Sequence, residues 1–429
     1  NIYGQGMWAA SLRYHEGRFY ICFVANDTRK TYLYTSEKID GPWKKQLIEG
    51  FYHDGSLLFD EDGRNYIVYG NDEIWITELN EDLTAPKKDG LHRLLVSDHK
   101  NPELGYEGSH IQKINGYYYI FLVHSLRDRW MRTEACFYSD SLEGEFTGGD
   151  VLCDDRGYCG QGVAQGGIVD TPDGKWYAML FQDSGAVGRI PILLPVTWKD
   201  HFPVFGQNGH VPEEIEVHST RPGYIYQPLV GSDDFCNGLL PRWQFNHDPD
   251  PRYYHLDTLQ GTYTITTREV CTELTQAVNT LTQRMSYPSC AAEVTVDASA
   301  LKEGDVAGLC ALQGCYAAVG ITKHHGKYEV LMLDKKEDGI LDMTEGTVVE
   351  SHQMDFRLEA DFCNMKDEAR CYYRVNKGDW LPIGTVHKLY FKLDHFTGCR
   401  FGLFCYAAEE TGGSACFRDF KYYDVDEIS

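Results

Sequence analysis

Four copies of one sequence repeat carry two carboxylates, a tryptophan and a glutamine at the same repeat position. Each copy reads as a strand, a tight turn at glycine and an aromatic-rich return strand. The turn glycines are Gly17, Gly63, Gly116 and Gly174. The residues nine positions earlier are Trp8, Asp54, Glu107 and Gln165. If the repeats are related by rotation, these side chains face a common axis. An Asp and a Glu held together beside an indole predict a site that cleaves glycosidic bonds.

The chemistry requires two carboxyl groups in different protonation states. One must stay protonated to donate to the leaving oxygen, and another must stay ionised to activate water. A second carboxylate nearby and aromatic neighbours both raise the pKa of such an acid. Asp54 and Glu107 could instead be turn formers ahead of strands, but their shared repeat position favours the catalytic interpretation. Trp8 could stack on a sugar or wedge between repeats, and Gln165 could bind hydroxyls or fill the axis.

Two further residues are candidates for substrate binding. Arg189 lies among apolar neighbours, so we expect a carboxylate partner and a role as an ion-pair anchor, in sugar binding, or both. His53 adjoins Asp54 and is counted with the substrate-binding group. His15, His53 and His110 lack the spacing of metal ligands, so no metal site is predicted.

The elements that must position these residues are short strands. From residue 1 to about 230 the chain alternates strands with turns rich in Gly, Asp and Asn, and helical periodicity is missing. Turns such as Asn115-Gly116 favour hairpins because they supply positive φ. An all-strand repeat of roughly 50 residues is typical of a β-propeller blade. Four blades are visible, so the expectation is a four-bladed ring or a further blade ahead of Asn1.

The chain changes character after residue 230. The repeat is lost, strand spacing becomes irregular, and alternating segments such as Gly261 to Thr266 and Tyr328 to Leu333 follow. Residues 231–429 therefore predict a β-sandwich of the jelly-roll, concanavalin-like type. The whole chain is predicted to be all-β, with a propeller over residues 1–230.

Composition restricts the partners. The formal net charge of -24 opposes binding to nucleic acid and is neutral toward uncharged glycans. No apolar run approaches the roughly 18 residues that a membrane span requires. The 14 cysteines contain no C-x-x-C pair, so we expect mostly free, buried thiols and lean toward a cytoplasmic location. A homo-oligomer is left open.

The motifs resemble glycoside hydrolase family 43, the five-bladed propeller enzymes that include β-xylosidases and α-L-arabinofuranosidases. The matching stretches are Gly6 to His15, His53 to Gly63, Tyr106 to Ile111 and Pro195 to Val204. The C-terminal part, from Ser232 through Leu309, resembles the β-sandwich that follows the propeller in many β-xylosidases of that family.

The resemblance implies a role for each residue. Glu107 would be the general acid of an inverting enzyme, Asp54 would tune its pKa and orient the substrate, and Trp8 and Arg189 would contact the sugar. The Asp that acts as general base in the family would lie in a first blade ahead of Asn1. Ala10 stands where many members have Pro. Gln165 stands where many have a His associated with an axial ion, so a structural calcium is not predicted.

Three functions are compatible with these residues. The first is an exo-glycosidase that releases xylose or arabinose from xylo-oligosaccharides or arabinoxylan, with galactan- or arabinan-directed activity as a variant. The second is a carbohydrate-binding protein without catalysis. The third, an unrelated propeller scaffold, is disfavoured because a scaffold gains nothing from two carboxylates in repulsion.

Overall fold

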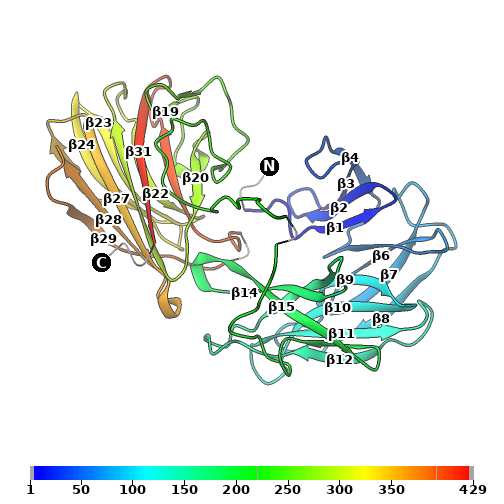
Figure 1. Ribbon diagram of the computed structural model, residues 1–429. Helices are drawn as coiled ribbons and strands as arrows, with labels where there is room; N and C mark the ends of the chain where they lie inside the picture. The colour runs from blue at the N-terminus through cyan, green and yellow to red at the C-terminus, as the bar shows by residue number, and fades with distance from the viewer. Residues whose placement is uncertain (1–3, 220, 393, 425–429) are drawn as a thin grey trace. The chain divides into compact units, whose positions relative to one another are not determined.

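The computed structural model describes residues 4–219, 221–392 and 394–424, and its regular elements are almost all β-strands (Figure 1). It contains two compact units. The first comprises Asn1–Asp183 and Ile190–Ser219, and the second comprises Ser184–Arg189 and Thr220–Ser429. The sequence predicted the division at residue 230, and that boundary stays a prediction. By compactness the first unit ends at Ser219, and the short segment 184–189 groups with the second unit.

The first unit is a propeller of four blades, as the repeat predicted, and each blade is a four-stranded antiparallel sheet in sequence order. Blade 1 contains β1 (Ser11–His15), β2 (Arg18–Ala25), β3 (Lys30–Ser36) and β4 (Lys44–Ile48). Blade 2 contains β5 (Ser56–Phe59), β6 (Asn65–Asn71), β7 (Glu73–Leu79) and β8 (His92–Ser97). Blade 3 contains β9 (Glu107–Ile114), β10 (Tyr117–Ser125), β11 (Arg132–Ser139) and β12 (Thr147–Leu152). Blade 4 contains β13 (Ala164–Asp170), β14 (Trp176–Asp183), β15 (Arg189–Lys199) and β16 (Phe202–Phe205).

The predicted hairpins form at the repeat glycines. In blade 1, His15 pairs with Arg18 across Glu16 and Gly17, whose φ angles are 47° and 79°. Positive φ at both central residues matches the right-handed twist of the flanking strands. The same geometry recurs in blade 3, where Asn115 and Gly116 have φ angles of 51° and 85°. These turns fix the register of the inner strands of blades 1 and 3. In blades 2 and 4 the expected two-residue turns are replaced by longer ones, since Phe59 pairs with Asn65 and Asp170 with Trp176.

The blades stack through alternating faces of their strands. On β10, Tyr118, Ile120 and Leu122 pack into a core with blade 2, whereas Tyr119 and Phe121 pack into a core with blade 4. This follows because successive side chains of a strand point to opposite sides of the sheet. A third core joins blades 1 and 2 around Leu33, Leu57 and Ile67. The inner strands of blades 2 and 3 therefore each lie between two apolar layers.

Blades 1 and 4 each leave one apolar face uncovered. On β1, Leu12 and Tyr14 are 49% and 64% exposed, and on β13 and β14, Val169 and Met179 are 55% and 49% exposed. These side chains lie opposite the faces that pack against blades 2 and 3. Large apolar side chains gathered on one face of a sheet normally have a covering layer.

The second unit is a β-sandwich, as predicted. Its eight-stranded sheet runs β17-β20-β30-β22-β23-β24-β25, with β26 paired to β24, and its seven-stranded sheet runs β18-β19-β31-β21-β27-β28-β29. The strands of the first sheet are β17 (Gln244–Phe245), β20 (Leu281–Arg284), β30 (Arg400–Tyr406), β22 (Val306–Leu312), β23 (Tyr316–His324), β24 (Lys327–Lys335), β25 (Leu341–Met343) and β26 (Thr347–Val349). The strands of the second are β18 (Tyr254–Asp257), β19 (Thr262–Thr266), β31 (Ser414–Asp424), β21 (Ser289–Asp297), β27 (Gln353–Asp361), β28 (Glu368–Val375) and β29 (Leu381–Lys388).

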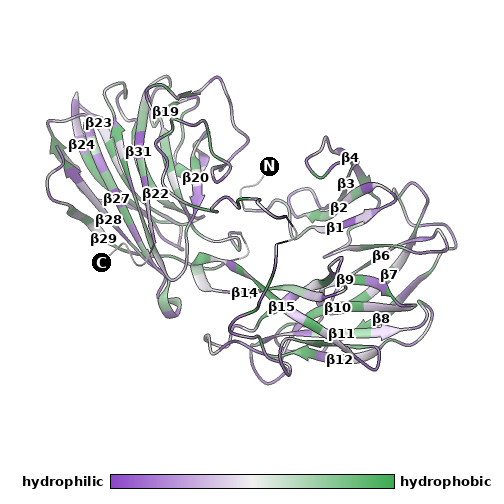
Figure 2. Ribbon diagram, viewed as in Figure 1, coloured by the Kyte–Doolittle hydropathy of each residue, from purple (hydrophilic) through white to green (hydrophobic). Residues whose placement is uncertain are grey.

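The two sheets of the sandwich pack face to face through β22 on β27 and β23 on β28. Apolar residues concentrate in the strands of both units (Figure 2). All fourteen cysteines are free, and only Cys153, Cys159 and Cys236 are exposed, which confirms the expected unpaired thiols. Among the described residues, the model has no helix with the length and apolar character of a membrane span.

Candidate active site

Asp54 and Glu107 meet where two inner strands begin. Asp54 lies two residues before β5 in a left-handed backbone conformation, with φ at 48°, and Glu107 is the first residue of β9. The backbone N–H of Gly108 donates to Asp54 Oδ2 at 3.0 Å, and the Ser109 hydroxyl donates to the Asp54 carbonyl at 2.7 Å. Blade 2 is thus bonded to the residues that follow the Glu107 carboxylate, which fixes the two acidic residues relative to each other.

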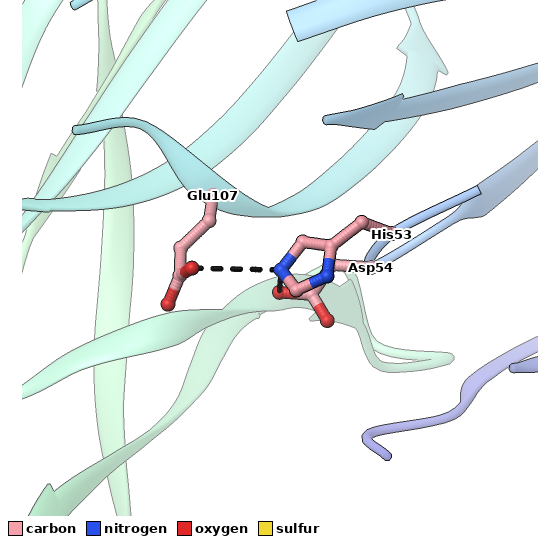
Figure 3. A group of neighbouring side chains, drawn as sticks. All are labelled: His53, Asp54 and Glu107. Atoms are coloured by element: carbon pink, nitrogen blue, oxygen red, sulfur yellow. Dashed lines mark ion pairs between the residues drawn. The ribbon is translucent and has the colours of Figure 1, made fainter. Parts of the chain in front are cut away.

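His53 lies between the two carboxylates (Figure 3). Its Nε2 is 3.6 Å from Asp54 Oδ2 and 3.5 Å from Glu107 Oε2. Burial opposes a charged imidazole, but the interaction with Glu107 and the charges of Asp54 and Glu107 outweigh it and raise the pKa of His53. A protonated His53 supplies one positive charge between two acidic groups.

Asn71 holds one oxygen of the Glu107 carboxylate. Its side-chain amide donates to Glu107 Oε2 at 2.8 Å from the end of β6. Asn71 was not among the candidates that the sequence pattern indicated. Its one sequence signal is a polar residue at the end of the strand that follows the Asp54 hairpin, and that signal is common in blade turns. Glu107 keeps 21% of its side chain exposed, and Asp54 keeps 9%.

Trp8 reaches the same cluster from blade 1. Its ring lies edge-on to the His53 imidazole, with the ring centroids 5.2 Å apart. The Trp8 backbone N–H donates to the Val24 carbonyl at 3.0 Å, which attaches this segment to the end of β2. The structure therefore brings Trp8, His53, Asp54 and Glu107 together from three consecutive blades.

Gln165 occupies the fourth repeat position, and its side chain lies beside Gly108, the residue that follows Glu107. A Cβ on Gly108, whose φ is 67°, would lie 2.7 Å from Gln165 Cγ, so only glycine fits between them. The Gln165 side-chain oxygen accepts from Arg132, and its backbone N–H donates to Glu134 Oε2 at 2.7 Å. Gln165 is 8% exposed, and its side-chain oxygen is engaged by the protein itself.

Arg132 and Glu134 form a buried layer that sequence reasoning missed. Arg132 is 2% exposed, bonds Asp183 Oδ2 at 3.0 Å, and lies 4.5 Å above the centre of the Phe181 ring. Glu134 is fully buried, and this burial raises its pKa well above the usual range. Both residues lie on β11, where the sequence shows only ordinary strand alternation, so nothing local marked them.

Arg189 belongs to the second compact unit. Its guanidinium lies 4.8 Å from the centre of the Phe396 ring, and its backbone N–H donates to the Phe396 carbonyl at 3.2 Å. Both of these contacts are with the loop before β30. Its role in sugar binding stays a prediction.

The cluster offers two kinds of chemistry. One atom each from His53, Asp54 and Glu107 lie within 4.8 Å of one another, which is close enough to share protons or to hold a cation. The ligand spacing in the sequence predicted no metal, and this stays a prediction. Two carboxylates at that distance repel each other unless His53 is charged or one of them is protonated.

Two family models match the chain in succession. "Glycosyl hydrolases family 43" matches residues 1–203, and "Beta xylosidase C-terminal Concanavalin A-like domain" matches residues 232–423. Among solved structures, the "Bifunctional GH43-CE" protein of Bacteroides eggerthii is 40% identical with a TM-score of 0.87. The match covers 99% of this chain and 55% of the Bacteroides eggerthii chain. An engineered family 43 glycoside hydrolase, titled as displaying endo-xylanase and exo-arabinofuranosidase activity, is 26% identical with a TM-score of 0.83. The match covers 99% of this chain and 86% of that one.

Curated relatives agree with these matches at lower identity. A "Beta-xylosidase" from Formosa agariphila is 25% identical over 99% of this chain and 78% of its own length. A "Xylosidase/arabinosidase" from Butyrivibrio fibrisolvens is 22% identical, and the match covers 99% of this chain and 87% of that protein. A relative from Xylanibacter ruminicola is 28% identical, and this chain spans 61% of it. The family model over residues 1–203 includes Asp54 and Glu107, and the family model over residues 232–423 covers the sandwich. The two models thus follow the order of the two units. The chain belongs to glycoside hydrolase family 43.

Proposed function

We propose that the protein is an inverting exo-glycosidase that releases xylose, arabinose or both from xylo-oligosaccharides or arabinoxylan fragments. The observation that carries this proposal is the pair Asp54 and Glu107, fixed across two blades and joined through His53. Family membership and the xylosidase and arabinosidase names of the relatives support the substrate class.

Glu107 is suited to donate a proton to the leaving oxygen. Asn71 binds one of its carboxyl oxygens, so the other is left to carry the proton, and the side chain keeps access to solvent. Asp54 is suited to a supporting role. Its Oδ2 accepts the Gly108 N–H, and its negative charge discourages ionisation of a neighbouring acid. Trp8 supplies an aromatic edge beside this pair, where sugar rings commonly pack.

Asp54 lies too close to Glu107 to be the general base of an inverting enzyme. Inversion needs carboxyl groups roughly 6.5–9.5 Å apart, because water must fit on the far side of the sugar. The close group of Asp54, Glu107 and His53 has ligand atoms within 4.8 Å. Direct attack by Asp54 is also disfavoured, because the Gly108 N–H occupies its Oδ2.

The uncovered faces of blades 1 and 4 indicate where the base could come from. Leu12 and Tyr14 on one side and Val169 and Met179 on the other are positioned to pack against a further sheet. An additional blade between them would complete the ring next to the axis. An Asp at the start of its inner strand would face Glu107 across the mouth, as the family resemblance implies.

The test uses the full-length protein with 4-nitrophenyl β-xyloside, α-L-arabinofuranoside and β-galactoside, together with xylobiose and arabinoxylan oligosaccharides. We expect sugar release from the xyloside, the arabinofuranoside or both, with the inverted anomer detected first by NMR. Retention of configuration, or full activity of Glu107→Gln on natural glycosides, would contradict the proposal. Exclusive release of galactose would redirect it to galactan.

A carbohydrate-binding protein without turnover is the second candidate. It is favoured by one observation: Asp54, Glu107 and His53 lie within 4.8 Å of one another, so this group does not itself provide two carboxyl groups at the separation that an inverting acid and base need. Isothermal titration separates the two. Binding of xylo-oligosaccharides with no sugar released by the full-length protein would support this second function over hydrolysis.

A further inference from the structure

A short hairpin loop beside Glu107 presents an exposed indole. The loop comprises residues 126–131, between β10 and β11, and Trp130 within it is 43% exposed. The other tryptophans that the structure describes are buried or half-buried. The loop also carries three charged residues, Arg127, Asp128 and Arg129. The exposed Trp130 indole therefore does not contribute to an apolar core.

Strand register places this loop next to the proposed acid. Val123 on β10 is opposite Glu107, and two residues later Ser125 is opposite Arg132. At about 3.3 Å per residue, the loop begins about 10 Å beyond Glu107 along the strand. Its other end reaches Arg132, which binds Gln165, and the Gln165 side chain lies against Gly108. Trp130 is two residues from Arg132, on the loop that continues past Glu107 at the same end of blade 3.

The loop is braced rather than loose. Leu126 N–H donates to the Met131 carbonyl at 3.1 Å, which closes its base, and Ser125 N–H donates to the Leu104 carbonyl at 3.0 Å. Arg127 pairs with the buried Asp98, whose own N–H donates to the Asp72 carbonyl at 2.8 Å. A loop held in this way presents its aromatic side chain with little ordering cost on binding.

The position of the loop decides which part of a substrate it can touch. His53 and Asp54 come from blade 2 and Trp8 from blade 1, so the sugar that is cleaved off would lie toward those blades. The loop rises from blade 3, the blade that carries Glu107. Its Arg127 pairs with Asp98, which follows β8 of blade 2, and its far end adjoins Arg132, which binds Gln165 of blade 4. A general acid protonates the oxygen of the leaving group, so the leaving group must lie beside Glu107 on the side away from the cleaved sugar.

We propose that Trp130 is a sugar-stacking platform for the leaving group, and that it selects substrates with two or more pentose units beyond the cleaved bond. This inference rests on the proposed function, because it takes Glu107 as the acid. The indole would pack on the C–H face of a xylose ring, as amphipathic aromatic side chains do. The exposed side of the loop would then favour oligosaccharides over disaccharides or simple glycosides.

The experiment compares Trp130→Ala, Trp130→Phe and the control Trp380→Ala with the unchanged full-length protein. Trp380 is a half-buried indole of the sandwich unit that stacks under Arg374, so its loss tests the general effect of removing a tryptophan. Each protein is titrated with xylose and with xylotetraose while tryptophan fluorescence is followed, and kcat and KM are measured on xylotetraose and 4-nitrophenyl β-xyloside.

We expect Trp130→Ala to raise KM for xylotetraose about tenfold with little change in kcat, a factor that corresponds to one good contact. Xylose affinity should be unchanged, Trp130→Phe should keep most of the affinity for xylotetraose, and Trp380→Ala should match the unchanged protein. Equal losses on xylose and xylotetraose, or no loss on either, would overturn the inference while leaving the hydrolase proposal intact. Binding of xylotetraose that depends on Trp130 without any turnover would support the platform and sink the hydrolase proposal. Absence of both binding and turnover would overturn both.

Discussion

Carboxylates in the two units are handled in opposite ways. In the sandwich, the Asp355 carboxylate accepts from Thr295 at 2.6 Å, Arg374 at 2.8 Å and Lys377 at 2.9 Å. Burial opposes its charge, but these donors outweigh the burial and lower the pKa of Asp355. In the propeller, Asp54 and Glu107 share a single histidine. A carboxylate whose negative charge is fully paired with donors and cations is typical of a stabilising role. A carboxylate whose charge is only partly paired is typical of a site that exchanges protons.

The sandwich also contains the other extreme. Asp305 is fully buried, its Oδ2 accepts the Lys302 N–H at 2.8 Å, and its Oδ1 has no hydrogen-bond partner among the described residues. Burial raises the pKa of Asp305 to about 6. A raised pKa therefore does not by itself indicate catalysis. Asp305 is sealed from solvent, whereas the Glu107 side chain remains 21% exposed at the mouth of the propeller.

The largest expected effect is on Glu107. Replacing it with Gln should reduce kcat on xylobiose by roughly 10²–10⁴-fold, the usual contribution of a general acid. The reduction should be far smaller on 2,4-dinitrophenyl xyloside, because that leaving group departs without protonation. Thermal unfolding should be nearly unchanged. An equal loss on both substrates would show that Glu107 does not act as the acid and would remove the contrast with Asp355.

The next effect concerns Asp54. Changing it to Asn keeps an acceptor for the Gly108 N–H and removes the charge beside Glu107. Removing the charge also removes one of the interactions that raise the pKa of His53, so the part of the kcat/KM profile that depends on charged His53 should move to lower pH. The rate at the optimum should also fall, by about 10-fold or more. A profile that keeps its shape would contradict the modulating role.

A smaller effect should appear in the pH dependence of stability at His53. Its pKa is raised in the folded protein, so charged His53 contributes stability that is complete below about pH 6.5 and is lost as pH rises through the folded pKa. His53→Gln should therefore lower the free energy of unfolding relative to the unchanged protein at about pH 5.5, and the difference should shrink by about pH 8.5. Denaturant titrations at both pH values measure it. A difference that grows with pH would mean that the carboxylates do not favour the charged ring.

The smallest effect tests the sandwich. Asp305 has a raised pKa in the folded state, so its protonated form is favoured there, and the stability it contributes falls as pH rises from about 4 to about 6. Asp305→Asn keeps the acceptor for Lys302 and removes the titration. The variant should be the more stable protein at about pH 8, with little difference at about pH 4. Unfolding curves that show no gain at the higher pH would indicate that Asp305 pairs with a cation.

Much of the propeller could be predicted because its repeat appears directly in the sequence. The turn glycines fix hairpin geometry, and rotation then brings Asp54 and Glu107 together although they are far apart in the chain. Asn71 and Arg132 could not be found this way. Their roles depend on the distance between neighbouring blades, and that distance is set by core packing rather than by local pattern. Arg189 shows the same limit, since its contact with Phe396 joins segments with no sequence relation.

The boundary between the units illustrates a different limit. The composition changes near residue 230, ahead of the first sandwich strand β17, whereas the compact units divide after Ser219. Segment 184–189 groups with the sandwich because Cys399 N–H donates to the Ala186 carbonyl at 2.8 Å and Arg189 contacts Phe396. A contact of a turn with a distant loop leaves no trace in hydrophobic periodicity, so sequence pattern alone cannot assign it.

The buried free thiols can report when each unit of the molecule unfolds. Cys22 and Cys136 are buried in the propeller, and Cys290, Cys310, Cys371, Cys399 and Cys405 are among those buried in the sandwich. A thiol sealed in a core reacts with alkylating reagents only when the surrounding structure opens. Brief alkylation at increasing denaturant, followed by peptide mass spectrometry, would therefore register the opening of each unit separately. Cys153, Cys159 and Cys236 would react from the start and serve as the internal standard.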